Sequence, residues 1–208
     1  MINYNHKILC YSDLGFIDYK EAWDLQQEIH KKRVLDEVED FLNENKISVY
    51  DIDRGGDITY HGPGQIVGYP IIDLNNWFND THKYLRALEE VIIKTCSYYG
   101  LEAGRNQKHT GVWLGDKKIA AIGIKVSRWV TMHGFAFNVN TNLGLFDGII
   151  PCGIKDKSVT SLKEELKREI DIQEVKKRLQ DNFKEVFGYA SVDIKHKNEI
   201  LKSNFINI

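Results

Sequence analysis

The stretch Arg54-Gly-Gly-Asp-Ile-Thr-Tyr-His-Gly-Pro-Gly-Gln-Ile-Val-Gly-Tyr-Pro70 holds five glycines and two prolines in 17 residues. Helix and strand interiors both disfavour this composition. Gly55-Gly56 lets backbone amides approach a ligand closely, because no Cβ stands in the way. His61-Gly-Pro-Gly64 predicts a turn that fixes the direction of the aromatic and imidazole side chains before it. We therefore interpret the stretch as a binding wall rather than as an ordinary glycine-rich loop.

Composition and charge limit the classes of protein to which this chain can belong. The chain has 208 residues, of which 42% are apolar, and its formal net charge is −2. These values allow a substantial core and argue against a general nucleic-acid binder. The sequence lacks an apolar run of the roughly 18 to 20 residues that cross a bilayer, and its first residues do not resemble a secretory signal. The three cysteines have no metal-ligand spacing. We therefore expect a cytoplasmic protein with reduced thiols, no metal and no membrane segment.

Apolar residues at helical spacing predict three helices. The first covers Tyr19 to about Leu42, the second begins near Thr81 as N-cap and is closed by Gly100, and the third covers about Asp171 to Phe187. The predicted buried stripes are Leu85, Leu88, Ile92 and Cys96 in the second helix, and Ile172, Val175, Leu179 and Phe183 in the third. Because Cys96 lies on a stripe, we interpret it as a small core residue, and Cys10 within a strand pattern in the same way.

Short apolar runs between turn residues predict the strands. They are Ile8–Cys10, Lys46–Ile52, Gln65–Ile72, Gly111–Leu114, Lys118–Val126 and Val130–Val139. Gly115-Asp116 is a hairpin turn, and Pro70 indicates an edge or the end of a strand. Helices and strands mix without strict alternation. The sequence therefore predicts an α+β fold, with a mixed β-sheet flanked by helices, in a single domain over residues 1–208.

Cys152 differs from the other thiols because it belongs to no periodic pattern and lies between a proline and a glycine. A free thiol has a pKa near 8.5, so little of it is thiolate at neutral pH unless a nearby cation lowers that pKa. Lys118, His61 and His133 are the candidates for that cation. The residue pattern alone leaves two interpretations open, a nucleophile or an inert loop cysteine.

Four motifs in the same order resemble the lipoyl(octanoyl) transferase family. They are Arg54-Gly-Gly-Asp-Ile-Thr-Tyr-His-Gly-Pro-Gly-Gln65, Gly111-Val-Trp followed by Lys118-Ile-Ala-Ala-Ile-Gly123, His133-Gly-Phe-Ala-Phe-Asn-Val139 and Pro151-Cys-Gly153. The similarity runs from about Tyr50 to Leu162 and more loosely through the terminal helices. It implies a fold like that of lipoate and biotin ligases.

The resemblance also implies the roles of site residues. Cys152 would be the acyl-thioester nucleophile, and Lys118 would lower its pKa and handle protons, although by pattern alone Lys118 is a solvated turn lysine. The implied substrate-binding residues are Arg54, Gly55, Gly56, Asp57, Ile58, Thr59, Tyr60, His61, Ala121, Ile122, Gly123, Gly134, Phe135 and Ala136. A thioester is already activated, so the implied reaction needs no nucleotide or other cofactor, and the sequence contains no P-loop.

The resemblance further implies partners. The donor would be octanoyl-acyl carrier protein, and the acceptors would be lysines on the lipoyl domains of 2-oxoacid dehydrogenase complexes and on the glycine cleavage H protein. This reaction is the first step of endogenous protein lipoylation. Two alternatives stay open: an ATP-dependent lipoate or biotin-type protein ligase, and a catalytically impaired acyl-binding homologue.

One feature of the family has no counterpart here. Members usually carry a segment like Glu-His-x-Pro-Val-x-Thr-x-Gly between the first helix and the strand before Arg54. This chain runs from Glu37-Val-Glu-Asp-Phe-Leu42 through Asn43-Glu-Asn-Lys46 directly into Ile47. The difference would remove a strand and part of the pocket wall.

Overall fold

A computed structural model describes residues 21, 24, 48, 59–146 and 158–190. The chain divides into two units, Met1–Val49 and Tyr50–Ile208, and every helix and strand given below belongs to the second. The predicted strands Ile8–Cys10 and Lys46–Ile52 and the predicted helix Tyr19–Leu42 lie almost wholly outside the described residues. A single domain over residues 1–208 stays a prediction.

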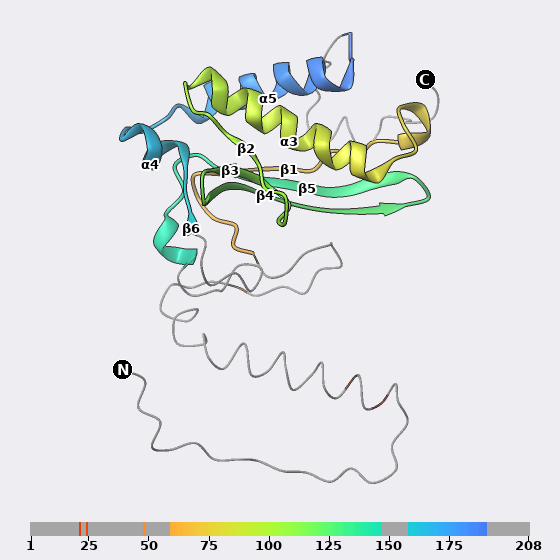
Figure 1. Cartoon of the computed structure of the whole chain (residues 1–208), viewed down its shortest axis with the longest axis horizontal. Helices are drawn as coiled ribbons and strands as arrows, with labels where there is room; N and C mark the ends of the chain where they lie inside the picture. Colours follow the sequence, from red (N-terminus) through yellow and green to blue (C-terminus); the bar gives the residue numbers. More distant parts are fainter. Residues whose placement is uncertain (1–20, 22–23, 25–47, 49–58, 147–157, 191–208) are drawn as a thin grey trace. The chain divides into compact units, whose positions relative to one another are not determined.

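The second unit is built on a six-stranded mixed sheet (Figure 1). Its strands are β1 (Gln65–Gly68), β2 (Gly104–Arg105), β3 (Val112–Leu114), β4 (Lys117–Ser127), β5 (Val130–Asn138) and β6 (Ser158–Val159). The order is β1-β5-β4-β3-β2 with antiparallel neighbours, and β6 runs parallel to the beginning of β4. The mixed sheet with flanking helices confirms the predicted α+β class.

Two long helices lie on one side of this sheet. The helical elements are η1 (Leu74–Asn76), α3 (Thr81–Tyr98), η2 (Leu143–Phe146), α4 (Leu162–Leu166) and α5 (Ile172–Phe187). Helix α3 packs on the sheet, and α5 packs against α3 on the same side (Figure 1). The N-cap of α3 is Asp80, one residue before the predicted Thr81, because the Asp80 carboxylate accepts a hydrogen bond from the Lys83 amide. Asp171, the first residue of the third predicted helix, is the N-cap of α5, because its carboxylate accepts a hydrogen bond from the Gln173 amide.

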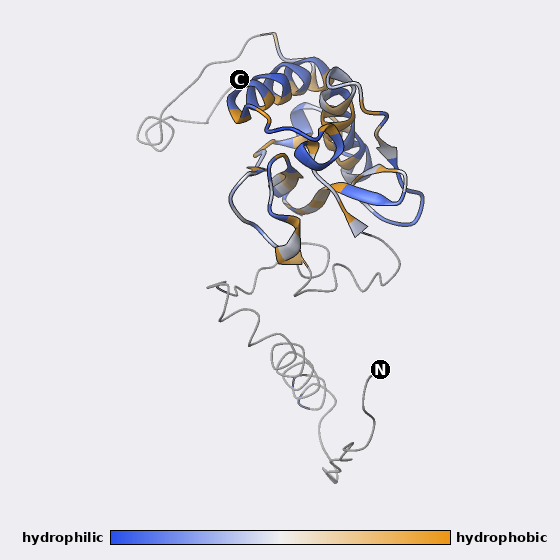
Figure 2. Cartoon of the chain, turned by 90° about the vertical axis from the view of Figure 1, so that its left-hand side faces the viewer, coloured by the Kyte–Doolittle hydropathy of each residue, from blue (hydrophilic) through white to orange (hydrophobic). Residues whose placement is uncertain are grey.

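The hydrophobic core lies between the sheet and the two long helices. The helical ribbons carry both hydrophobic and hydrophilic residues along their length (Figure 2), as is typical of amphipathic helices. The fully buried core side chains include Leu74, Tyr84, Leu88, Val91, Ile92, Cys96, Val112, Ile119, Phe137, Val139, Leu162 and Val175. Leu88, Ile92 and Cys96 confirm the predicted stripe of α3. Leu85 is only half-buried, because the buried face of the helix is centred on Tyr84, Leu88 and Val91.

Strand ends differ from the predicted ones where the backbone cannot continue the ladder. Strand β1 stops at Gly68 rather than Ile72, since Pro70 has no amide hydrogen to donate. The β4–β5 hairpin turns at Arg128 and Trp129, which both have positive φ, 51° and 65°. Two such residues are typical of the type I′ turn, whose twist matches paired strands. Strands β2 and β6, of two residues each, are too short for a sequence pattern to predict.

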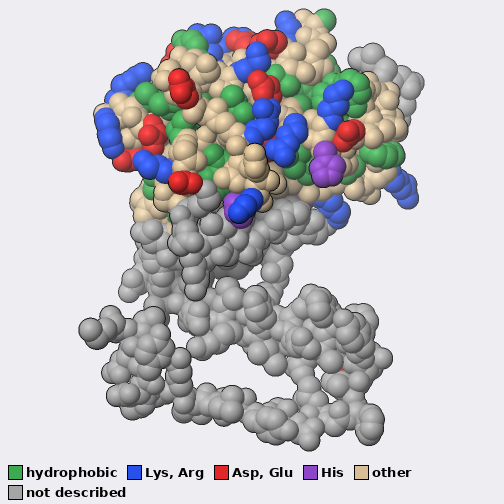
Figure 3. Space-filling view, viewed as in Figure 1, with side chains coloured by type: hydrophobic (Ala, Val, Ile, Leu, Met, Phe, Trp, Pro, Cys, Tyr) green, Lys and Arg blue, Asp and Glu red, His purple; other side chains and the backbone are tan. Residues whose placement is uncertain are grey.

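The surface of the described part mixes both signs of charge. On the face seen in Figure 3, lysine and arginine side chains are interspersed with aspartate and glutamate. Many of them form exposed ion pairs, such as Lys94–Glu185 and Lys177–Asp181. Within the described ranges, helices long and apolar enough to cross a membrane are absent.

Leu88→Ala should lower the free energy of unfolding by about 2–5 kcal/mol, because it leaves a cavity beneath a fully buried side chain. Leu85→Ala is the matched control on the same helix, and its effect should be clearly smaller because Leu85 is half-buried. Urea unfolding of both variants measures the difference. Equal losses would contradict the placement of the α3 face.

Candidate active site

The structure describes part of the predicted site. Cys152 and Arg54–Ile58 lie outside the described residues, whereas Lys118, Thr59–His61 and the two predicted strand segments 121–123 and 134–136 are described. Lys118, Ala121 and Ala136 lie on the face of the sheet opposite α3 and α5, since their neighbours Ile119, Ile122 and Phe135 belong to the helix-side core. We call this face the site face, and its side chains are those of Gln65, Val67, Trp113, Lys118, Ala121, Ala136 and Asn138.

A β-bulge places Lys118 on the site face. Val112 pairs with Ala120, but the next residue of β3, Trp113, pairs with Lys118, so the register shifts by one residue. Ile119 and Ala120 are consecutive and both buried in the helix-side core. In a regular strand, residues 118 and 120 would share a face, and the bulge separates them. The Lys118 Nζ lies 4.8 Å from the centroid of the Trp113 ring, on the site face.

Small residues form the floor of the site face beside Lys118. Ala121 pairs with Ala136, and Ala136 pairs in turn with Val67. Gly123 pairs with Gly134 one step further along the hairpin. Ala121 and Ala136 present only methyl groups here, whereas the space beside Gly134 is occupied, since a Cβ there would lie 2.3 Å from the Gly68 carbonyl oxygen. The pocket-lining role of Ala121, Gly123 and Ala136 stays a prediction.

Two predicted lining residues point away from this floor. Ile122 and Phe135 pair with each other across β4 and β5, and their side chains pack into the helix-side core. A Cβ added to Gly68 would lie 2.4 Å from the Phe135 ring, so the ring covers that glycine closely. Ile122 and Phe135 can therefore border the site only through their backbone.

The described end of the glycine-rich stretch is a type II turn. Pro63 occupies its second position, Gly64 has φ +80° at the third, and the Gln65 amide donates to the Gly62 carbonyl over 3.2 Å. This confirms the predicted turn. Tyr60 folds back over Gly62, where a Cβ would meet its hydroxyl, and packs edge-on against Phe146 at 5.4 Å. Burial raises the pKa of the Tyr60 phenol.

A chain of hydrogen bonds joins this turn to the strand that carries Lys118. His61 Nδ1 lies 2.8 Å from Gln65 Oε1, and Gln65 Nε2 donates to Asn138 Oδ1 over 2.9 Å. Asn138 Nδ2 donates to the Thr160 carbonyl over 2.9 Å. The Thr160 amide donates to the Lys118 carbonyl, also over 2.9 Å. The predicted histidine and the predicted lysine are thus held in one polar network.

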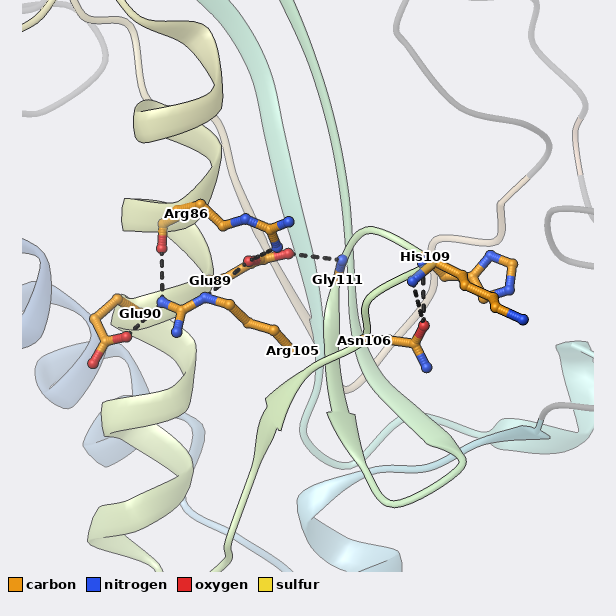
Figure 4. Close-up of polar contacts among 8 residues, drawn as sticks. Arg86, Glu89, Glu90, Arg105, Asn106, His109 and Gly111 are labelled. Atoms are coloured by element: carbon orange, nitrogen blue, oxygen red, sulfur yellow. Dashed lines mark hydrogen bonds and ion pairs between the residues drawn. The ribbon is translucent and has the colours of Figure 1, made fainter.

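Glu89 supports the site from the helix side, and the sequence-based prediction missed it (Figure 4). Its side chain is fully buried; Oε2 accepts from Arg86 over 2.7 Å and from Arg105 over 3.1 Å, while Oε1 accepts from the Gly111 amide over 3.2 Å. The available signal was a carboxylate within the apolar stripe, between Leu88 and Val91. Glu89 thereby fixes the chain just before Trp113.

The backbone conformation and close contacts of Gly111 explain why the residue before β3 is a glycine. Its φ is +124°, and an added Cβ would lie 2.5 Å from the Ala120 carbonyl oxygen and 3.4 Å from the Lys118 Cε. The close approach brings the Glu89-bound backbone against the bulge and against the stem of Lys118. A side chain at position 111 would push β3 away from β4.

Cys96 is the thiol that the structure describes. It is fully buried in α3, and desolvation raises its pKa to about 12. A thiol with that pKa is almost entirely protonated at neutral pH and is a poor nucleophile. Its predicted role as a core residue is confirmed.

Gly111→Ala should cost about 2–3 kcal/mol of unfolding free energy, because the Cβ meets a backbone oxygen and the residue keeps a left-handed φ. Gly104→Ala is the matched control, since nothing lies within 4 Å of an added Cβ there. Urea denaturation compares the two. If Gly104→Ala proved the more damaging, the close contact at Gly111 would be wrong.

Comparison with sequence relatives identifies the family. Residues 28–184 match the lipoyl protein ligase A/B catalytic domain. An octanoyltransferase of Christiangramia forsetii is 47% identical over 219 residues, covering 84% of this chain and 94% of the relative. An octanoyltransferase of Caldicellulosiruptor saccharolyticus is 42% identical over 225 residues, covering 93% and 95%. The 219 aligned positions exceed the 208 residues of this chain, so the first relative carries residues with no counterpart here.

Solved structures agree on the fold. A lipoate-protein ligase A bound with ATP superposes with a TM-score of 0.58 at 19% identity, covering 78% of this chain and 68% of that one. A bipartite lipoate protein ligase from Thermoplasma acidophilum gives a TM-score of 0.57 at 19% identity, covering 78% and 67%. These similarities confirm the predicted ligase-like architecture. The sequence matches confirm the family resemblance: the chain belongs to the lipoyl protein ligase A/B catalytic domain family, among its octanoyltransferases.

Proposed function

We propose that this octanoyltransferase moves an octanoyl group from acyl carrier protein to a lysine of a lipoyl domain through a thioester on Cys152. The observation that carries the proposal is the bulge at Ile119, which places Lys118 beside a floor of small residues on the site face. The donors and acceptors are acyl carrier protein, the lipoyl domains of 2-oxoacid dehydrogenase complexes and the glycine cleavage H protein. The reaction takes place in the cytoplasm.

The proposed reaction has two steps. In the first, the Cys152 thiolate attacks the donor thioester, a new carbon–sulfur bond forms, and the carrier thiolate leaves. In the second, the amine of the acceptor lysine attacks the enzyme thioester, the amide bond forms, and the Cys152 sulfur leaves. The amine has a pKa near 10.4, so it must lose a proton before it attacks. The thioester supplies the activation, and neither step uses ATP.

Lys118 suits both steps. Its ammonium group beside a sulfur would stabilise the thiolate of Cys152 in the first step. Its half-buried position on the site face, next to the Trp113 ring, removes part of the water that would otherwise screen this charge. In the second step the neutral amine form would accept the proton that the acceptor nitrogen releases. The substrate-binding residues Arg54–His61, Ala121–Gly123 and Gly134–Ala136 would surround the acyl chain through side chains or backbone.

Incubation with octanoyl-acyl carrier protein in the absence of ATP should add one octanoyl group to the protein, on Cys152. Intact mass and peptide mapping measure the adduct. Cys152→Ala should abolish it, whereas Cys96→Ala should retain it because the Cys96 thiol is buried and its pKa is about 12. An adduct on Cys96, or one that forms only with ATP and the free acid, would refute the thioester mechanism.

Lys118→Ala should raise the pKa of Cys152 by removing the adjacent cation. The iodoacetamide rate at neutral pH should then fall by about tenfold, and its inflection should move to higher pH. Lys117→Ala is the matched control, since Lys117 is the preceding residue, half-exposed and paired with Glu165. If both variants gave the same pH profile as the parent, Lys118 would not activate the thiol.

A further inference from the structure

Hydrogen-bond chemistry fixes the orientation of two amide side chains at the site. The Thr160 carbonyl can only accept, so the group of Asn138 that faces it must be the NH2 group. The Asn138 oxygen therefore points to Gln65. The Tyr60 carbonyl, 3.3 Å from Gln65 Nε2, is a second obligatory acceptor on the same side. Two backbone carbonyls, one on each side of the pair, thus determine that Gln65 turns its NH2 group inward and its oxygen outward.

The orientation of Gln65 determines the tautomer of His61. Gln65 Oε1 can only accept, and it lies 2.8 Å from His61 Nδ1. Nδ1 must therefore carry the proton. In the neutral imidazole only one ring nitrogen is protonated, so Nε2 then has a free lone pair. His61 is exposed, and among the described residues no hydrogen bond to its Nε2 is present.

We propose that Gln65, held by Asn138 and the Tyr60 carbonyl, is a positioning residue that keeps neutral His61 as the Nδ1–H tautomer, so that Nε2 accepts a hydrogen bond from the attacking amine of the acceptor lysine. The imidazole of a free histidine prefers the opposite tautomer, with the proton on Nε2, which could only donate. The role of the amine rests on the proposed acyl transfer. The tautomer rests on the hydrogen bonds alone.

The tautomer can be measured directly in the full chain. The ¹⁵N shifts of the histidine rings, recorded by long-range ¹H–¹⁵N correlation near pH 8, distinguish a protonated from an unprotonated ring nitrogen. His61→Phe assigns the signals of His61. In the parent, Nδ1 should be protonated and Nε2 not. Gln65→Met removes the acceptor with little change in length and should return His61 to the Nε2–H tautomer, while Gln173→Met, an exposed glutamine on α5, should change nothing.

A double-mutant cycle tests whether Gln65 acts through His61. Octanoylation of a lipoyl domain should fall by about tenfold in Gln65→Met. In the His61→Phe background the same Gln65→Met change should have little further effect, since the ring that it orients is gone. A purely structural role of Gln65 would give the same factor in both backgrounds.

The outcomes separate this inference from the proposed function. An Nε2–H tautomer in the parent, or an unchanged tautomer in Gln65→Met, would overturn the positioning role whatever the activity. Additive losses in the cycle would overturn the link between Gln65 and the amine. A parent that holds the Nδ1–H tautomer but transfers no octanoyl group would refute the proposed reaction, and with it the role of the amine, and leave the tautomer assignment standing.

Discussion

The buried amide of Asn138 is the constraint on which the site depends. The side chain is 4% exposed, and a buried amide that loses its partners costs about 1–3 kcal/mol for each unsatisfied group. The Asn138 side chain donates a hydrogen bond to the Thr160 carbonyl and accepts one from the Gln65 amide. These two partners belong to segments far apart in sequence. The end of β5, the residue after β6 and the start of β1 are therefore locked together, and the glycine-rich turn and the Lys118 strand keep a fixed separation.

Features set by nearby residues could be predicted from the sequence. The Asp171 cap, the turn at Gly115-Asp116 and the type II turn around Pro63 each depend on residues within a few positions. The long strands β4 and β5 also followed from their pattern. Helix α3 began with Asp80 instead of Thr81 because both residues are good caps and only the structure shows which carboxylate or hydroxyl reaches the amides.

The features of the site that could not be predicted depend on contacts between residues far apart in the sequence. The family motif pointed to Lys118, but the sequence does not show that a bulge separates its face from that of Ala120. Likewise, the position of Glu89 within the apolar stripe indicates a buried carboxylate, but the sequence does not show that its partners are Arg105 and Gly111. The family motifs include Ile122 and Phe135 in the predicted pocket lining, whereas strand alternation turns their side chains to the core.

The bulge also affects how distant relatives should be compared. Strand β4 changes phase at Ile119, so a one-residue insertion between Lys118 and Ile119 would place the inserted residue on the site face and turn the lysine side chain into the apolar layer beneath α3. Such a homologue would still align a lysine with this one, and a search by residue identity would score it as intact. The spacing between that lysine and the alanines after it, rather than the lysine alone, therefore distinguishes a homologue whose lysine lies on the site face from one whose lysine is buried.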